Sequence, residues 1–436
     1  MKILQTIVLG CMLTTTISNA QMSNEYVLSS VENAISKALE TNPTLEVYQL
    51  QQDIAQKNYK IAKAYKLPTL TGTANGQRNV SLATTPLPGE IFGQPGETIN
   101  AQFGQKYQYN AGININNNVF DWQLHLNKKI AKANVDLADL DTQAFQQKLV
   151  EQTSLYYYSA LMTQEAIHIN EQDLKIADSI LQLTTDKFHQ GLLDKIALNN
   201  SKINVNKIKQ TKVSNTQQLN LYLKELHVLL GLKDNQTIVL EESLKSTPKQ
   251  LLSTGTLNTD ADVSMFELQK DQSELNLKYQ KASLYPKLSM YSYIGKQYFS
   301  NDFGFANSVW NDYRYVGLNV SVPIFSGFTN KNKIKKAKIE FDIATQNYEN
   351  ELTKSKLDDE VLIENYLSGF KSLEVSMETY QLRKENSELV YQKYTEGLIR
   401  LEEYLVAFEE YLNAQNNYLN TLSNTYSYHA TILSRQ

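Results

Sequence analysis

Apolar and polar residues alternate along the segment YQYNAGININNNVF, residues 107–120. One register is mainly Tyr, Ala, Ile and Val, and the other is Gln, Asn and Gly. A period of two residues predicts a strand whose two faces meet different environments. In 313–325, Val316, Leu318 and Val320 alternate with Gly317, Asn319 and Ser321. Further strands are expected at about 69–80 and 287–298, which makes four.

Much of the remaining chain follows a helical period. Two series step by three and four residues, as in a coiled-coil seam: Ile130, Ala133, Leu137, Leu140 and Ala144, and Ile334, Ala337, Phe341, Ala344 and Tyr348. Prolines are absent from 96–247 and 324–436. We therefore expect long helices at 121–190 and 326–396, each roughly 105 Å long at 1.5 Å per residue. Each ends at a glycine, and return helices follow at 192–230 and 398–432.

The second half of the chain repeats the first. NKKIAKAN (127–134) matches NKIKKAK (332–338), DKFHQGLLD (186–194) matches QKYTEGLIR (392–400), and LPTL (67–70) matches YPKL (285–288). This order predicts a tandem duplication. The first repeat is expected at 21–230, with an opening helix at about 30–66. The second is expected at 263–436, with an opening helix at about 262–284, and a linker region at 231–262 joins them. Stacked end to end, the short helices of a repeat approach the length of its long helix, so they are expected to pair with it.

The N-terminus, MKILQTIVLGCMLTTTISNAQ, has a basic start, a short apolar run and a small-residue site. This pattern is typical of a secretory signal peptide at 1–20, cleaved after Ala20. The single cysteine, Cys11, leaves lipidation open as an alternative. No later run is long and apolar enough for a spanning helix.

Composition and motifs exclude several kinds of function. The net charge is −4, which does not favour nucleic acid as a partner. The five histidines are scattered, and no HExxH, GxSxG or phosphate-binding glycine motif occurs. We therefore expect no enzyme activity, no cofactor and no metal site.

A sheet with one apolar and one polar face is common in soluble proteins, and it also fits an outer-membrane β-barrel. The signal peptide and the length of the helices favour the barrel, because four strands beside such helices form no sensible globular core. Four strands cannot close a barrel alone, so copies of the chain are expected to share one. The expected lipid face is Tyr109, Ile113, Ile115, Val316, Leu318 and Val320. The expected lumen face is Asn110, Asn114, Asn116, Asn118, Asn319 and Ser321. Interfacial aromatic girdles are expected from Tyr107, Tyr109, Tyr291, Tyr293, Tyr298, Tyr313, Tyr315 and Trp310.

These segments resemble the TolC family of outer-membrane efflux ducts. The resemblance rests on VPIFSGFTNKNKIKKAK (322–338), its counterpart NNVFDWQLHLNKKIAKA (118–133) and the paired KFHQGLLD and KYTEGLIR, and it covers both repeats. It implies a mainly α fold with a membrane β-barrel. In that fold a homotrimer forms a 12-strand barrel in the outer membrane and a 12-helix duct through the periplasm. The implied function is a passive conduit in a tripartite efflux or type I secretion system.

The resemblance also implies a periplasmic tip at the two helix turns. Its candidate residues are Gly191, Asp194, Gly397, Arg400, Glu402 and Glu403. Glu403 falls where the family often has a tip carboxylate, whereas Val406 and Ala197 replace acids found in some members. The implied partners are a periplasmic adaptor (membrane fusion) protein, an inner-membrane pump of RND, ABC or MFS type, and outer-membrane lipid.

The alternative is a periplasmic coiled-coil adaptor or envelope scaffold, which would need no two-faced strands. The sequence leaves open the cargo, the pump class and the direction in which each strand face points.

Overall fold

The computed structural model describes residues 25–242, 257–258, 260–304 and 309–435. The expected signal peptide and much of the expected linker lie outside these residues. The chain divides into two compact units. The strand unit comprises the described residues within 43–148, 254–365 and 435–436, and the hairpin unit those within 1–42, 149–253 and 366–434. Each of the two long helices contributes one part to each unit.

Seven α-helices account for most of the described chain. They are α1 (Val31–Thr41), α2 (Pro43–Lys63), α3 (Trp122–His189), α4 (Lys195–Leu229), α5 (Ala261–Ala282), α6 (Thr329–Thr395) and α7 (Leu401–Leu433), with 3-10 turns at Ala64–Lys66 and Gly89–Phe92. The single helix expected at 30–66 is wrong. Asn42 has an extended ψ of 120° and separates α1 from α2, because a residue that precedes proline disfavours the helical region.

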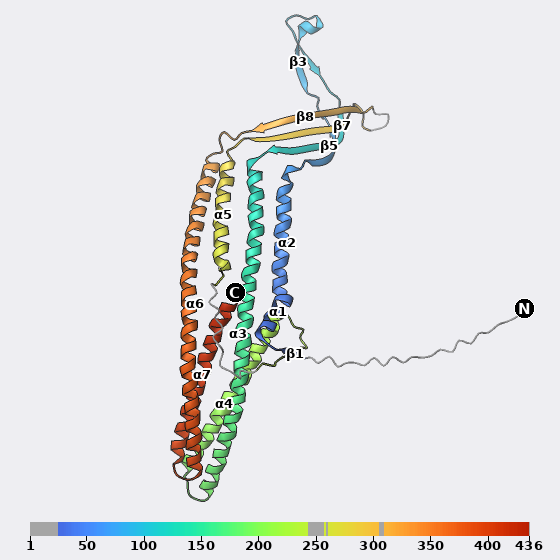
Figure 1. Ribbon diagram of the computed structural model, residues 1–436. Helices are drawn as coiled ribbons and strands as arrows, with labels where there is room; N and C mark the ends of the chain where they lie inside the picture. The colour runs from blue at the N-terminus through green and yellow to red at the C-terminus, as the bar shows by residue number, and fades with distance from the viewer. Residues whose placement is uncertain (1–24, 243–256, 259, 305–308, 436) are drawn as a thin grey trace, which may run out of the picture. The chain divides into compact units, whose positions relative to one another are not determined.

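The strand unit contains a four-stranded antiparallel sheet in the order β2-β5-β7-β8 (Figure 1). Its strands are β2 (Thr69–Arg78), β5 (Tyr107–Phe120), β7 (Lys287–Ser300) and β8 (Asn311–Ser321). The expected end of β8 at Phe325 is wrong. The strand stops at Ser321, two residues before Pro323, which has no N–H to donate to a ladder.

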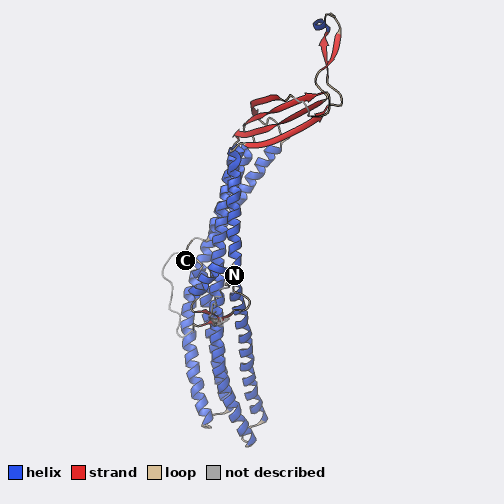
Figure 2. Ribbon diagram, turned by 90° about the vertical axis from the view of Figure 1, so that its right-hand side faces the viewer, coloured by secondary structure: helices blue, strands red, loops and turns tan. Residues whose placement is uncertain are grey.

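The loop expected to be irregular at 84–98 contains structure of its own. β3 (Thr84–Pro88) and β4 (Thr98–Gln102) pair as an antiparallel hairpin, drawn in red with the other strands in Figure 2. The prolines at 86 and 88 obscured this strand in the sequence, because proline is usually confined to edge strands.

In the strand unit each short helix packs on a long one. The ring centres of Tyr48 in α2 and Phe145 in α3 are stacked 4.6 Å apart. The Nζ atom of Lys270 in α5 lies 4.3 Å from the ring centre of Tyr348 in α6. The Asp121 carboxylate accepts a hydrogen bond from the Gln123 N–H at 2.8 Å, so it caps α3 directly after β5. Strand and long helix are therefore joined by a single residue.

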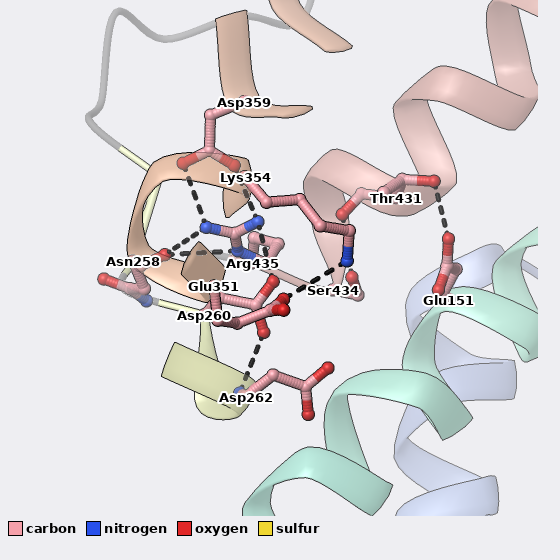
Figure 3. A network of polar contacts seen from close by, with 10 residues as sticks. All are labelled: Glu151, Asn258, Asp260, Asp262, Glu351, Lys354, Asp359, Thr431, Ser434 and Arg435. Carbon is pink, nitrogen blue, oxygen red and sulfur yellow. Dashed lines mark hydrogen bonds and ion pairs between the residues drawn. The ribbon is translucent and has the colours of Figure 1, made fainter. Parts of the chain in front are cut away.

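Arg435 contacts two separate segments of the strand unit, α6 and the residues just before α5 (Figure 3). Arg435 is 9% exposed, and its guanidinium donates to both oxygens of Asp359 in α6, at 2.8 and 3.2 Å. It also donates to the Asn258 carbonyl at 2.8 and 3.1 Å and lies 3.5 Å from Asp260, the N-cap of α5. A planar donor fork of this kind fixes the start of α5 beside α6.

In the hairpin unit parts of four helices enclose one core. The core consists of Ala177 and Ile180 of α3, Ala197, Val205 and Ile208 of α4, Tyr394 of α6, and Leu401, Tyr404, Phe408, Tyr411 and Leu412 of α7. The unit also holds a feature that the sequence did not predict. β1 (Glu25–Leu28) pairs in parallel with β6 (Thr237–Leu240).

None of the helices in the described part of the chain combines the length and apolarity needed to cross a membrane.

Candidate functional sites

The register of the sheet determines which side chains share a face. Ile113 of β5 lies opposite Ile294 of β7, and Ser292 of β7 lies opposite Val316 of β8. Because paired residues project to the same side and successive residues alternate, every side chain of the sheet can be assigned to one of two faces.

The apolar face carries all six residues expected to meet lipid. They are Tyr109, Ile113, Ile115, Val316, Leu318 and Val320, and β7 adds Leu288, Met290 and Ile294. Towards the loop end of β7 and β8 this face becomes charged and aromatic. Asp312 pairs with Arg314 at 3.1 Å and with Lys296 at 3.5 Å. Tyr298 lies between Tyr109 and Trp310, with ring centres 5.9 and 5.8 Å apart.

The polar face carries all six residues expected to line the lumen. They are Asn110, Asn114, Asn116, Asn118, Asn319 and Ser321. β2 contributes threonines, and the Asn114 amide donates to the Thr73 hydroxyl at 3.0 Å. Hydroxyl and amide groups therefore line the part of the polar face that β2 and β5 form.

The expectation that eight aromatic residues form lipid-facing girdles is wrong for four of them. Tyr291, Tyr293, Tyr313 and Tyr315 lie on the polar face, because Tyr291 opposes Asn116 and Tyr293 opposes both Asn114 and Tyr315. The signal was present in the sequence. Tyr313 and Tyr315 have the same parity as Asn319 and Ser321, and extending that alternation backwards would have placed them correctly.

The helix turns of the hairpin unit have matching backbone geometry. Gly191 and Gly397 have φ of +75° and +77°. After α3 the Gly191 and Leu192 N–H groups donate to the carbonyls of Phe188 and Lys187, and the equivalent bonds follow α6. This is the Schellman ending, in which glycine takes the left-handed position without a side-chain clash. It explains why each long helix stops at its glycine.

The remaining candidate tip residues differ between the two turns. The Asp194 carboxylate accepts from the Ala197 N–H at 2.8 Å and caps α4, whereas Arg400 caps α7 without a side-chain bond. Glu402 and Glu403 are exposed in the first turn of α7. Ala197 is buried in the core, and Val406 is exposed.

Sequence reasoning missed a buried carboxyl in the hairpin unit. Asp173 of α3 is 1% exposed, and its two oxygens accept from the Tyr411 hydroxyl at 2.9 Å and the Gln415 amide at 3.1 Å, both on α7. Burial raises the pKa of Asp173, while these hydrogen bonds and Lys384 act in the opposite direction. Its position four residues before Ala177 and seven before Ile180 continues the buried seam, and this spacing was the available signal.

The described residues contain no group of three or more His, Cys, Asp or Glu side chains placed to hold a metal ion. The polar groups that the structure brings together are caps, helix contacts and strand faces.

The sequence profile described as "Outer membrane efflux protein" matches residues 34–232 and 252–432. The chain belongs to the outer membrane efflux protein family. The resemblance deduced from the motifs is thereby confirmed. Channels of this family work in efflux systems, so the protein is an export duct of the outer membrane that extends into the periplasm.

Solved structures show the same fold as this outer membrane efflux protein. The CmeC outer membrane channel of Campylobacter jejuni aligns with a TM-score of 0.74 at 18% identity, over 93% of this chain and 85% of that one. The outer membrane protein VceC of Vibrio cholerae aligns with a TM-score of 0.75 at 17% identity, over 92% of this chain and 95% of that one. The open state of the MtrE outer membrane channel of Neisseria gonorrhoeae aligns with a TM-score of 0.72 at 17% identity, over 93% of this chain and 88% of that one. No curated protein sequence gives a significant match.

Proposed function

We propose that three copies of the chain close one outer-membrane barrel, through which cargo leaves an efflux complex. The observation that carries this proposal is the pair of open edges of the four-stranded sheet, β2 and β8. Every neighbouring pair in the sheet is antiparallel, so β2 and β8 run in opposite directions. β8 of one copy is therefore able to pair antiparallel with β2 of the next. Three sheets of four strands give twelve, an even number within the bacterial range.

In this assembly the apolar face meets lipid and the polar face lines the lumen. Support comes from the length of the apolar face. Leu288 and Tyr298 of β7 are ten residues apart, which is about 33 Å along a strand. A strand tilt of about 40° reduces this to about 25 Å, the usual height of the apolar band of such barrels. The aromatic group of Tyr109, Tyr298 and Trp310 then lies at one boundary of the band.

The helix turns at Gly191 and Gly397 form the periplasmic tip of the proposed duct. There a periplasmic adaptor and an inner-membrane pump of RND, ABC or MFS type dock, and the pump supplies the energy. Glu402 and Glu403 are the exposed acids at this end, with Arg400 beside them, and they are the proposed pore residues. Asp194 serves mainly as a helix cap. Opening separates the α3–α4 and α6–α7 turns from one another.

Arginine substitutions on alternate positions of β5 test the assignment of the faces. Ile113→Arg and Ile115→Arg place a charge in lipid, where it costs about 2–4 kcal/mol near the bilayer midplane. They are expected to reduce the amount of trimer in the outer membrane. Asn114→Arg and Asn116→Arg place the same charge in water and are expected to assemble normally. Trimer is measured by cross-linking of outer-membrane fractions.

Equal loss on both faces would contradict the assignment of the faces. A monomer recovered from the periplasm without detergent would contradict the duct itself.

A further inference from the structure

Four tyrosine rings form one continuous group on the polar face of β7 and β8. The ring centres of Tyr293 lie 5.7 Å from Tyr313 and 5.8 Å from Tyr315. Tyr315 lies 5.4 Å from Tyr313 and 6.0 Å from Tyr291. We call these four residues the tyrosine wall. Tyr293 is buried, at 7% exposed, whereas Tyr291, Tyr313 and Tyr315 are 41%, 43% and 42% exposed.

Glycines on the same face make room for the two rings of β7. A Cβ on Gly317 would lie 2.4 Å from Tyr291 Cζ, and a Cβ on Gly112 or Gly295 would lie 2.7 Å from Tyr293 atoms. These two rings therefore extend over backbone instead of standing upright between side chains. Any side chain larger than hydrogen at these glycines would displace them.

The surroundings of the tyrosine wall are polar and nearly uncharged. By register, the other residues of this face are mainly asparagines, threonines, serines and glutamines of the four strands, with Phe299 near the loop end of β7 and Lys287 as the one charged residue of the face. Lys287 is itself paired with Asp121 at 3.2 Å. A surface of exposed aromatic rings without competing charge favours ligands that stack.

We propose that the tyrosine wall is a stacking site for planar aromatic molecules in transit. The inference rests on the proposed function, because it requires the polar face to be the lumen. A planar cargo lies against the exposed rings of Tyr291, Tyr313 and Tyr315, while the side-chain amides of β5 form hydrogen bonds with its polar edge. The rings attract cations as well, so planar aromatic cations bind best. Each contact is weak, worth two- to tenfold in affinity per ring, so cargo is retained briefly and released.

Binding of the planar aromatic cation proflavine to the full-length protein tests this site. The protein is placed in lipid nanodiscs, and fluorescence polarisation is measured against empty nanodiscs. The combined substitution Tyr291→Ser, Tyr313→Ser and Tyr315→Ser is expected to weaken binding at least tenfold. The three Tyr→Phe changes keep the rings and are expected to retain binding within about twofold, and the particle mass of the serine variant shows whether it still assembles.

Tyr298→Ser on the apolar face is the matched control and is expected to leave proflavine binding unchanged. The proposal is overturned if wild-type protein binds no more dye than empty nanodiscs, or if the serine and phenylalanine variants bind equally. The mass of the same particles separates the two hypotheses. A trimer with serine-insensitive binding rejects the tyrosine wall alone, whereas a monomer rejects the proposed duct.

Discussion

At the scale of single residues, the ring of Tyr291 in β7 fills the space beside Gly317 of β8. Only glycine at position 317 leaves this space free. A Cβ at position 317 would approach Tyr291 Cζ to 2.4 Å, which is far inside van der Waals contact. Gly317→Ala is therefore expected to lower the stability of the sheet by about 1–3 kcal/mol, the usual cost of overpacking. Thermal unfolding of the purified protein measures the loss.

Two further variants isolate the cause of that loss. Gly72→Ala adds a methyl group in open space on β2 and is expected to be nearly neutral. Adding Tyr291→Ser to Gly317→Ala removes the clash and is expected to recover most of the stability. Without such recovery, the effect of Gly317→Ala would have to come from the backbone and not from the ring.

Asp173 makes the stability of the hairpin unit depend on pH. Burial raises the pKa of its carboxyl, so the folded state binds the proton more readily than the unfolded state does. The stabilisation from protonated Asp173 is complete below the ordinary pKa of about 3.9 and is lost as the pH rises through the raised value. Asp173→Asn removes this dependence and is expected to stabilise the protein at pH 7.5 but not at pH 3.5.

Unfolding temperatures at several pH values test this prediction. The control is Asp178→Asn, an exposed carboxyl on the same helix, which is expected to show no such difference between the two pH values. Tyr411→Phe removes a hydrogen-bond donor to buried Asp173 and is expected to cost about 1–3 kcal/mol. The pKa assignment is wrong if Asp173→Asn destabilises most at neutral pH.

At the scale of elements, the two return helices begin with different caps. Asp194 caps α4 through a 2.8 Å bond, so Asp194→Ala is expected to cost about 1 kcal/mol. Arg400 offers α7 no side-chain bond. Arg400→Ser would place a serine three residues before Glu403, the capping-box spacing, and is expected to gain about 0.5–1 kcal/mol. Thermal unfolding of the Asp194→Ala and Arg400→Ser variants measures both effects. If the two unfolding temperatures shift equally in one direction, the capping argument is contradicted.

The elements that the sequence predicted well are those whose signal is local. The alternation of 107–120 coincides with β5 at both ends, and the long helices end beside Gly191 and Gly397 because glycine takes the left-handed position there. The missed strand β1 depends on a contact distant in sequence. β1 is only four residues long and pairs with β6, more than 200 residues away, so no local period reveals it.

The candidate sites depend on both local and distant signals. Period-two parity alone was enough to separate Ile113 from Asn114, and the register agrees with that separation. For the tyrosines, parity conflicts with the general enrichment of aromatic residues at membrane interfaces, and the register agrees with parity. Asp173 required knowledge of α7, because a carboxyl inside a helical seam is stable only when another helix supplies donors.

At the scale of the whole molecule, the open edges β2 and β8 make the isolated sheet incomplete. Within one copy β5 and β7 separate them, so their Cα atoms lie about 14 Å apart, three times the strand spacing. A disulfide requires Cα atoms within about 7 Å. Cysteines placed on β2 and β8 of the same chain are therefore expected to join different copies and not one copy to itself.

Oxidation of paired cysteine variants tests the proposed closure. Asn319→Cys on β8 is combined in turn with Thr71→Cys, Thr73→Cys and Asn75→Cys on β2, all on the polar face. Antiparallel neighbours bring Cβ atoms within about 5.5 Å in one register only, so one combination is expected to give covalent dimers and trimers on a non-reducing gel. The control combines Asn114→Cys with Asn319→Cys. Because β5 is an inner strand, this variant is expected to stay monomeric on the gel. Closure through these edges is rejected if no β2 position cross-links, or if the inner-strand control cross-links as well.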